Sequence, residues 1–257
     1  MSDAPVITCA IPTLNGAATL EWTLLSLRNQ QEVDVKIIVV DSGSTDDTLA
    51  ICHRWNIETR FAERGNMYRA VNEGLRDAQT QWITYLNSDD LVYPTTYRDL
   101  LALAEREKAD VAYGDFDFID AEGRYLYSLQ MADPSSLDAL FRIPLQGLPQ
   151  PGTIFTRALF EKLGGFSTDY RLISDADFFF RALRAGAKFV RLPKPVCAFR
   201  MHANQQTVTR AAEMRAEALR LREAAGGRTP RTWMSLAGWR LRNFPNYALR
   251  FLRTRTR

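Results

Sequence analysis

The chain has 257 residues, of which 46% are hydrophobic and 25% charged, as is usual for a globular protein with a sizeable core. No run of residues approaches the roughly 18 consecutive apolar positions of a membrane-spanning helix, which argues against an integral membrane protein. Three cysteines without CxxC spacing argue against a disulfide framework. The N-terminal residues lack the basic and apolar segments of a signal peptide, so we expect a cytoplasmic protein.

The charge of the chain is unevenly distributed. The net charge is +3, yet no acidic residue follows Glu223, whereas eight arginines do. Subtracting these eight from +3 leaves −5 for the first 223 residues. Such a split is typical of a basic tail that meets an anionic surface, so we expect peripheral attachment at the inner face of the cell membrane.

The first half of the chain alternates apolar, strand-like runs with helix-like stretches. In chain order these are Val6–Ile11, Ala17–Arg28, Val35–Val40, Ile57–Phe61, Met67–Ala78 and Trp82–Leu86. Ser44 with Asp47 three residues later predicts a helix cap between the second and third strands. This alternation predicts an α/β fold with a mostly parallel central sheet flanked by helices.

The second half has a different rhythm. Strands are predicted at Asp110–Asp115 and Gly152–Thr156, a hairpin over 116–129, and a helix at Ser174–Ala185 that Gly186 ends. Residues 189–192 and 196–199 are predicted to be extended. We therefore predict one domain over residues 1–210, with halves 1–115 and 116–210, followed by a basic helical tail over 211–257.

The tail carries an apolar stripe at helical spacing. Its members are Trp233, Ala237, Leu241, Phe244, Ala248 and Phe251. Pro245 interrupts the stripe, so two short helices are predicted rather than one. Arginines beside such a stripe are typical of a helix in an anionic membrane interface, where each contributes about 1 kcal/mol. The stripe would equally pack on the domain or on a second subunit, whereas nucleic-acid binding is not expected because the tail has no base-reading motif.

Two adjacent carboxylates, Asp89 and Asp90, follow the apolar run that ends at Leu86. Ligands of open α/β sheets gather at the carboxyl ends of strands, and neighbouring like charges call for a positive partner. We therefore predict a divalent cation that holds phosphate oxygens, with one acid reaching the metal and the other ribose or water. The alternative is that Asp90 caps the next helix.

Asp41 also ends a buried strand and precedes Ser42-Gly43-Ser44. Its carboxylate would accept the imide N–H of a uracil or thymine ring, while Gly43 lets the backbone approach the base. The alternative is that Asp41 only caps the following turn.

Asp175 lies at the start of the predicted helix over 174–185. Ser174 and Asp177 fit a capping box there, which leaves Asp175 spare in the first turn. A carboxylate at a helix N-terminus is stabilised as the anion, so Asp175 is the candidate general base. His202 follows the last extended run and would complete a metal shell or contact phosphate, or it would simply be solvated.

Together these segments resemble the inverting glycosyltransferases of family 2, which have the GT-A fold. VITCAIPTLNGAATL, VVDSGSTDDT, RGNMYRAVNEGLRDA and YLNSDD resemble the donor half of that family, and QPGTIFTRALFEKLGGF with ISDADFFFRAL resembles its acceptor side. The resemblance implies a nucleotide site, a cation (Mn²⁺ or Mg²⁺) site and a catalytic base. The nucleotide residues would be Pro12, Thr13, Asn15, Asp41, Gly43 and Asp89, the metal ligands Asp90 and His202, and the base Asp175.

The function that this resemblance implies is metal-dependent, inverting transfer of a sugar from a nucleoside-diphosphate donor, with UDP or dTDP favoured. The acceptor would be a saccharide or a lipid-linked saccharide in surface polysaccharide or glycolipid assembly. Asn87 and Ser174 stand where many members carry acids. This departure supports a rival interpretation, a non-catalytic sugar-nucleotide-binding or membrane-scaffolding protein. A nucleotidyltransferase is a second rival, although the first loop lacks its glycines and lysines.

Overall fold

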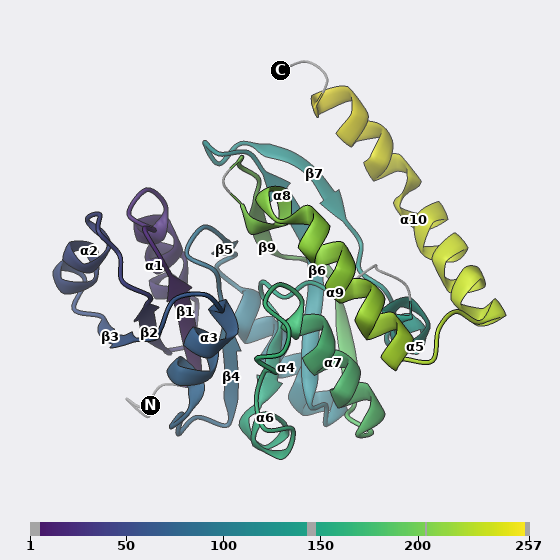
Figure 1. Ribbon diagram of the computed structural model, residues 1–257, viewed down its shortest axis with the longest axis horizontal. Coiled ribbons are helices and arrows are strands. Elements are labelled where there is room, and N and C mark those ends of the chain that lie inside the picture. Colours follow the sequence, from purple (N-terminus) through teal and green to yellow (C-terminus); the bar gives the residue numbers. More distant parts are fainter. Residues whose placement is uncertain (1–5, 143–147, 204, 255–257) are drawn as a thin grey trace.

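The structure is a computed structural model that describes residues 6–142, 148–203 and 205–254. Its centre is one nine-stranded sheet with the order β3-β2-β1-β4-β8-β6-β9-β5, to which β7 adds by pairing with β6. Helices lie on both sides of this sheet (Figure 1). The predicted α/β fold class is confirmed.

The first four strands form the parallel half of the sheet. They are β1 (Ile7–Thr13), β2 (Val35–Asp41), β3 (Glu58–Phe61) and β4 (Trp82–Tyr85). Thr13 lies beside Asp41 in the register of β1 and β2, so these two strands end at the same edge of the sheet. β4 is parallel to β1 on its other side, and its loop therefore opens at that edge too.

The remaining strands form a mixed half. They are β5 (Leu91–Val92), β6 (Val111–Ile119), β7 (Tyr125–Leu129), β8 (Ile154–Thr156) and β9 (Phe189–Arg200). β8 is antiparallel to both β4 and β6, whereas β6 and β9 are parallel. The predicted hairpin is the β6–β7 pair. The two extended runs predicted after residue 188 are one strand, β9, whose pairing with β6 shifts register near Gly114 and Asp115.

Two hydrophobic cores cover the two faces of the sheet. One face is covered by α1 (Leu20–Arg28), α2 (Thr48–Arg54) and α4 (Thr96–Glu107). The helices on the other side are α3 (Met67–Leu75), α5 (Pro134–Phe141), α6 (Arg157–Lys162), α7 (Ser174–Arg184), α9 (Ala211–Ala224) and α10 (Pro230–Thr254). A short helix, α8 (Gln206–Thr209), precedes α9. The buried aromatic residues Phe155, Phe166, Phe178 and Phe179 pack together in the second core.

The two capping interpretations were wrong. α2 begins after Asp47, and the Ser44 hydroxyl donates to the Asp41 carboxylate instead. α7 begins at Ser174 itself, whose hydroxyl donates to the backbone oxygen of Ser167 at 2.7 Å. In both cases a partner elsewhere in the fold competes successfully with the local cap.

The prediction of two short tail helices was also wrong, because α10 continues through Pro245. Proline cannot donate to the carbonyl four residues earlier, that of Leu241. Leu241 and Pro245 are both exposed, so the interruption lies on the solvent side of the helix, where one missing backbone hydrogen bond is tolerated. No helix within the described ranges is long and apolar enough to cross a membrane.

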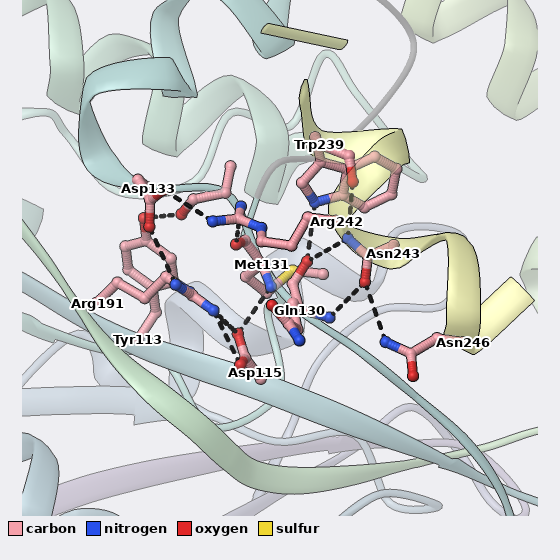
Figure 2. A network of polar contacts seen from close by, with 11 residues as sticks. Tyr113, Asp115, Gln130, Met131, Asp133, Arg191, Trp239, Arg242, Asn243 and Asn246 are labelled. Carbon is pink, nitrogen blue, oxygen red and sulfur yellow. Dashed lines mark hydrogen bonds and ion pairs between the residues drawn. The ribbon is translucent and has the colours of Figure 1, made fainter. Parts of the chain in front are cut away.

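The tail helices are docked on the rest of the protein. Leu221 of α9 and Leu236 and Trp239 of α10 belong to the same core as Phe178. Figure 2 shows the polar contacts at this junction. Asn243 pairs with both backbone groups of Gln130, at 2.8 and 2.9 Å. The predicted division at residue 210 stays a prediction, although residues on both sides of it share one core.

An ion-pair chain continues the same junction (Figure 2). Arg242 of α10 donates to Asp133, and Asp133 also accepts from Arg191 of β9 at 3.0 Å. Arg191 in turn holds both oxygens of Asp115. Arg191 and Asp115 are almost fully buried, so this pair between β9 and β6 is screened little by solvent, and α10 joins it through the more exposed Asp133.

Asn243→Ala is expected to destabilise the fold by about 2 kcal/mol, since it leaves the buried N–H of Gln130 without an acceptor. Urea unfolding measures this loss. Phe244→Ala is the matched control on the same helix, because its side chain is 69% exposed, and it should change stability by less than about 0.5 kcal/mol. Equal losses in the two variants would contradict the assigned role of Asn243.

Candidate functional site

The loops after β1, β2 and β4 are joined at one edge of the sheet. The backbone N–H of Asn15 donates to the Ser44 hydroxyl, and the Asn15 side-chain oxygen accepts from the Thr45 N–H, both at 2.8 Å. Gly16 lies between the other pair of loops, where a Cβ would come within 2.5 Å of Thr13 Oγ1 and 3.1 Å of Ser88 Oγ. Only glycine permits this approach, so three loops form one surface.

Asp41 is buried and organises the turn that follows it. One carboxylate oxygen accepts from the N–H groups of Gly43 and Ser44 at 2.8 and 2.9 Å, and the other accepts from the Ser44 hydroxyl. This is the alternative role foreseen for Asp41, and its contact with a base stays a prediction. Arg64, for which no role was predicted, donates to the carbonyl oxygens of Ser42 and Gly43 and covers the same turn.

Two buried oxygens near this edge have no hydrogen-bond partner. They are Thr13 Oγ1, at the end of β1, and Asn87 Oδ1, in the loop after β4. Pro12, Thr13 and Asn87 all belong to segments predicted to meet a nucleotide. An unsatisfied buried polar atom costs free energy, so both atoms are suited to a ligand that completes their bonding.

Asp90 points into the protein. It is fully buried, one oxygen accepts from the backbone N–H of Arg200 at 3.0 Å, and the other accepts from the Asn87 amide at 3.2 Å. Burial raises the pKa of Asp90 well above its usual range, and the charge of Asp89 acts in the same direction. The helix-cap alternative for Asp90 was wrong, because α4 begins only at Thr96.

His202 faces Asp89 rather than Asp90. Its Nε2 lies 2.9 Å from Asp89 Oδ2, and both side chains are about a quarter exposed, at 26% and 24%. Arg200 holds this turn in place by donating to the Asp89 carbonyl at 3.0 Å and to that of Ala121 at 2.9 Å. The structure thus brings Asp89, the predicted ribose contact, beside the histidine, whereas the carboxylate of Asp90 is engaged by Arg200 and Asn87, and the two predicted metal ligands stay a prediction.

The chemistry of this pair fits a divalent cation. In the described part of the chain no group of three or more His, Cys, Asp and Glu is arranged to hold a metal ion. Mg²⁺, however, is commonly bound through one or two carboxylates and takes its other ligands from substrate phosphates and water. The partly exposed Asp89 carboxylate meets that requirement, and the neutral imidazole of His202 beside it is a common ligand of transition metals.

Asp175 lies in the first turn of α7 and is hydrogen-bonded to a tyrosine of α3. The Tyr68 hydroxyl donates to Asp175 Oδ1 at 2.9 Å. Burial, followed by the charge of Asp175, raises the pKa of Tyr68 well above its usual value, so this hydroxyl stays a proton donor. Asp175 is buried, with 8% of its surface exposed.

A second buried tyrosine connects the two acidic regions. Burial, then the neighbouring Tyr68, Asp175 and Asp90 groups, raise the pKa of Tyr85 far above its usual value. The Tyr68 and Tyr85 rings meet edge-on with centroids 6.2 Å apart, and Tyr85 is the last residue of β4, directly before the loop that carries Asp89 and Asp90. Asp175 and the Asp89-Asp90 turn therefore belong to one region of the molecule.

This convergence agrees with the comparison to known proteins. The family described as Glycosyl transferase family 2 matches residues 8–187. The chain belongs to this family. It is a glycosyltransferase enzyme with an α/β architecture, which answers the rival interpretations of a non-catalytic protein and of a nucleotidyltransferase.

The curated relatives are named as glycosyltransferases. The chain is 30% identical over 197 residues to the "PGL/p-HBAD biosynthesis glycosyltransferase" of Mycobacterium bovis, covering 73% of each protein. It is 26% identical over 194 residues to an uncharacterized glycosyltransferase of Rickettsia typhi, covering 72% of this chain and 61% of that protein.

Solved structures share the fold. TarS of S. aureus (residues 1–349) superposes with a TM-score of 0.65 at 20% identity, over 85% of this chain and 64% of that one. The mannosyltransferase PcManGT of Pyrobaculum calidifontis, in complex with GDP-Man and Mn²⁺, superposes with a TM-score of 0.63 at 21% identity, over 98% and 74%. This chain therefore spans just under two thirds of the TarS chain. These neighbours show the GT-A fold.

Proposed function

We propose that this glycosyltransferase is inverting and metal-dependent, and that it moves a sugar from a nucleoside diphosphate to an acceptor hydroxyl. One observation carries the proposal: the Tyr68 hydroxyl binds Asp175 at 2.9 Å, and the Tyr68 ring packs edge-on against Tyr85, the last residue of the strand that leads into the Asp89-Asp90 turn. A base and a diphosphate-binding turn must lie on either side of the anomeric carbon for a direct displacement.

The cation site is assigned to Asp89 and His202 in this proposal. Asp90 was the expected ligand, but its carboxylate accepts hydrogen bonds from Arg200 and Asn87. A bound Mn²⁺ or Mg²⁺ would neutralise the negative charge of the departing diphosphate. Asp90 instead supports the turn, because its oxygens fix the backbone of Arg200, whose guanidinium holds the Asp89 carbonyl.

Asp175 acts as the general base. Its carboxylate takes the proton of the acceptor hydroxyl as the hydroxyl oxygen attacks the anomeric carbon. The bond from that carbon to the phosphate oxygen breaks on the opposite face, and its electron pair leaves with the nucleoside diphosphate. Tyr68 donates to the same carboxylate and so holds it in orientation for the transfer.

The donor is proposed to be a UDP- or dTDP-sugar. TarS has been solved with UDP and with UDP-GlcNAc, and PcManGT with GDP-Man. Thr13 Oγ1 and Asn87 Oδ1, both buried and without a partner, would complete their hydrogen bonds on such a donor. Pro12, Asn15, Asp41 and Gly43 would shape the base pocket, because their loops are already held together.

The acceptor is proposed to be a saccharide or a lipid-linked saccharide. The mycobacterial relatives are named for PGL/p-HBAD biosynthesis, and a glycolipid acceptor for this chain is consistent with its basic C-terminal helix.

The test is turnover of a panel of UDP-, dTDP- and GDP-sugars by the whole chain, with Mn²⁺, with Mg²⁺ and with chelator. Release of nucleoside diphosphate that depends on the cation and on a UDP- or dTDP-sugar supports the proposal. Cation-independent release, or release of pyrophosphate, would overturn it. NMR of the product anomeric proton separates inversion from retention.

Tyr68→Phe should lower kcat about tenfold with little change in KM for the donor, because a hydrogen bond to the charged base is lost. That bond favours the ionised form of Asp175, so the acid limb of the pH–rate profile should move to higher pH. Tyr113→Phe is the matched control, since its buried hydroxyl donates to the Ala132 carbonyl instead. An unchanged pH profile in Tyr68→Phe would exclude the assigned role.

A further inference from the structure

Helix α10 has one face that packs against the protein. Thr232, Leu236, Trp239 and Asn243 recur at intervals of three or four residues and are 0%, 7%, 5% and 0% exposed. The indole N–H of Trp239 and the Asn243 amide both donate to the Gln130 carbonyl (Figure 2). These buried side chains account for the docking of the helix on β7 and α5.

The opposite face of α10 carries a row of exposed side chains. Four large apolar side chains are exposed there, namely Trp233 (52%), Met234 (76%), Leu241 (78%) and Phe244 (69%). Ala237, Gly238 and Pro245, which lie between them, are exposed as well. Within residues 233–245 the one exposed charged side chain is that of Arg240. Such a continuous apolar stripe on a surface marks an interaction site rather than scattered exposed residues.

The surroundings of this stripe are positively charged. Arg228 stacks on the Trp233 ring, with its guanidinium carbon 4.9 Å from the ring centre. Arg231 and Arg240 are exposed on the same helix. In the sequence Arg250, Arg253, Arg255 and Arg257 follow, and no acid occurs after Glu223. The partner of the stripe must therefore be both apolar and anionic.

We infer that the outward face of α10 lies in the interface of an anionic lipid bilayer. A lipid surface supplies an apolar layer directly beneath a layer of negative charge, which matches the stripe and its flanking arginines. The biological use of this contact, bringing the enzyme to a lipid-linked acceptor, rests on the proposed function, whereas the binding itself does not.

A second copy of this chain fits the face less well. A two-fold contact places the same surface opposite itself, so arginines would meet arginines with no acid of this segment to pair with them. Nucleic acid fits less well too, because Leu241, Met234 and Ala237 offer nothing to a phosphate. The sequence left open whether the tail packs on the domain or binds a membrane. One face of α10 packs on the domain, and the opposite face is exposed and would bind lipid.

The test is co-sedimentation of the whole chain with phosphatidylcholine vesicles, with and without about one third phosphatidylglycerol. The chain should bind only the anionic vesicles, and added salt should release it. Arg240→Glu should weaken binding by about fivefold or more. The double variant Leu241→Ser with Phe244→Ser should weaken it by at least about tenfold, because these side chains lose their apolar burial.

The matched control is the double variant Trp22→Ser with Leu49→Ser. These side chains, on α1 and α2, are 62% and 45% exposed and lie on the other core's helices. Their loss should leave vesicle binding unchanged. Circular dichroism melts check that both double variants remain folded.

Three outcomes would overturn the inference. One is equal binding to neutral and anionic vesicles or to neither, and another is undiminished binding by the α10 double variant. The third is a dimer in light scattering that this variant dissociates, which would assign the face to a second copy. Donor turnover is measured on the same samples in detergent-free buffer, so that the two proposals are tested separately. Vesicle binding without turnover would contradict the proposed function and leave the membrane inference standing.

Discussion

Asp175→Asn is expected to lower kcat for sugar transfer by roughly a thousandfold, within the range that general bases contribute. Asparagine has the shape of aspartate and keeps an oxygen to accept from Tyr68, but it cannot take the acceptor proton. Donor affinity should stay within about twofold, because Asp175 does not belong to the loops after β1, β2 and β4. Steady-state transfer and calorimetric donor titration measure the two quantities.

Asp177→Asn is the matched control for this experiment. Asp177 lies two residues further along the same helix, and its carboxylate pairs with Arg181 at 2.7 Å. Transfer by this variant should remain within a few-fold of the unmodified enzyme. Comparable loss in both variants would mean that α7 needs its charges for folding, and retained transfer in Asp175→Asn would remove this residue from the mechanism.

The central strands β1, β2 and β4 of the parallel half were predictable because they are buried almost throughout, whereas β3 at the edge is largely exposed. Val35–Val40 and Trp82–Leu86 read as continuous apolar runs, as such strands do, and each is followed by a polar loop. The carboxyl ends of parallel strands share an edge, so the loops containing Asn15, Asp41 and Asp89 could be expected together. That expectation needs only the order of the strands.

The second half was less predictable, although one signal was overlooked. Helix α4 buries Tyr97, Leu100, Leu101 and Ala104, whose spacing is that of an amphipathic helix, yet no helix was predicted there. Pro245 predicted a break in the tail helix, but α10 continues through this residue, which is exposed to solvent. Ser44 and Ser174 matched local capping patterns, but their hydroxyls found partners in Asp41 and Ser167 that a local pattern does not include.

The division of roles within the site depends on contacts between distant residues. Tyr68 and Asp175 are 107 residues apart, and the backbone of Arg200 reaches Asp90 across 110. Adjacent carboxylates leave a strand in different directions, and the sequence does not say which one faces inward. The backbone N–H of Arg200 decides this, because it binds Asp90 and leaves Asp89 beside His202. Arg200 and Tyr68 were missed for this reason.

Asp89→Asn is expected to weaken Mn²⁺-dependent donor binding by roughly 100-fold, since loss of even an outer partner of a metal ligand costs 10- to 100-fold in affinity. The variant removes the negative charge that faces His202 while keeping the shape of the side chain. Titration of the donor with and without Mn²⁺, together with titration of Mn²⁺ alone, measures the effect without relying on turnover. His202→Gln should weaken the same binding, by about tenfold.

Asp90→Asn is the control that separates the two adjacent acids. Its retained oxygen still accepts from Arg200, and its new amide would donate to Asn87 Oδ1, which lacks a partner, once the Asn87 amide turns over. Folding should therefore persist, and Mn²⁺-dependent donor binding should weaken by no more than about tenfold, the cost of the one hydrogen bond that Asn87 Oδ1 no longer makes to the donor. The opposite pattern, with binding lost in Asp90→Asn and kept in Asp89→Asn, would return the cation to Asp90. The buried hydrogen bonds from Arg200 and Asn87 would then have to break whenever the donor binds.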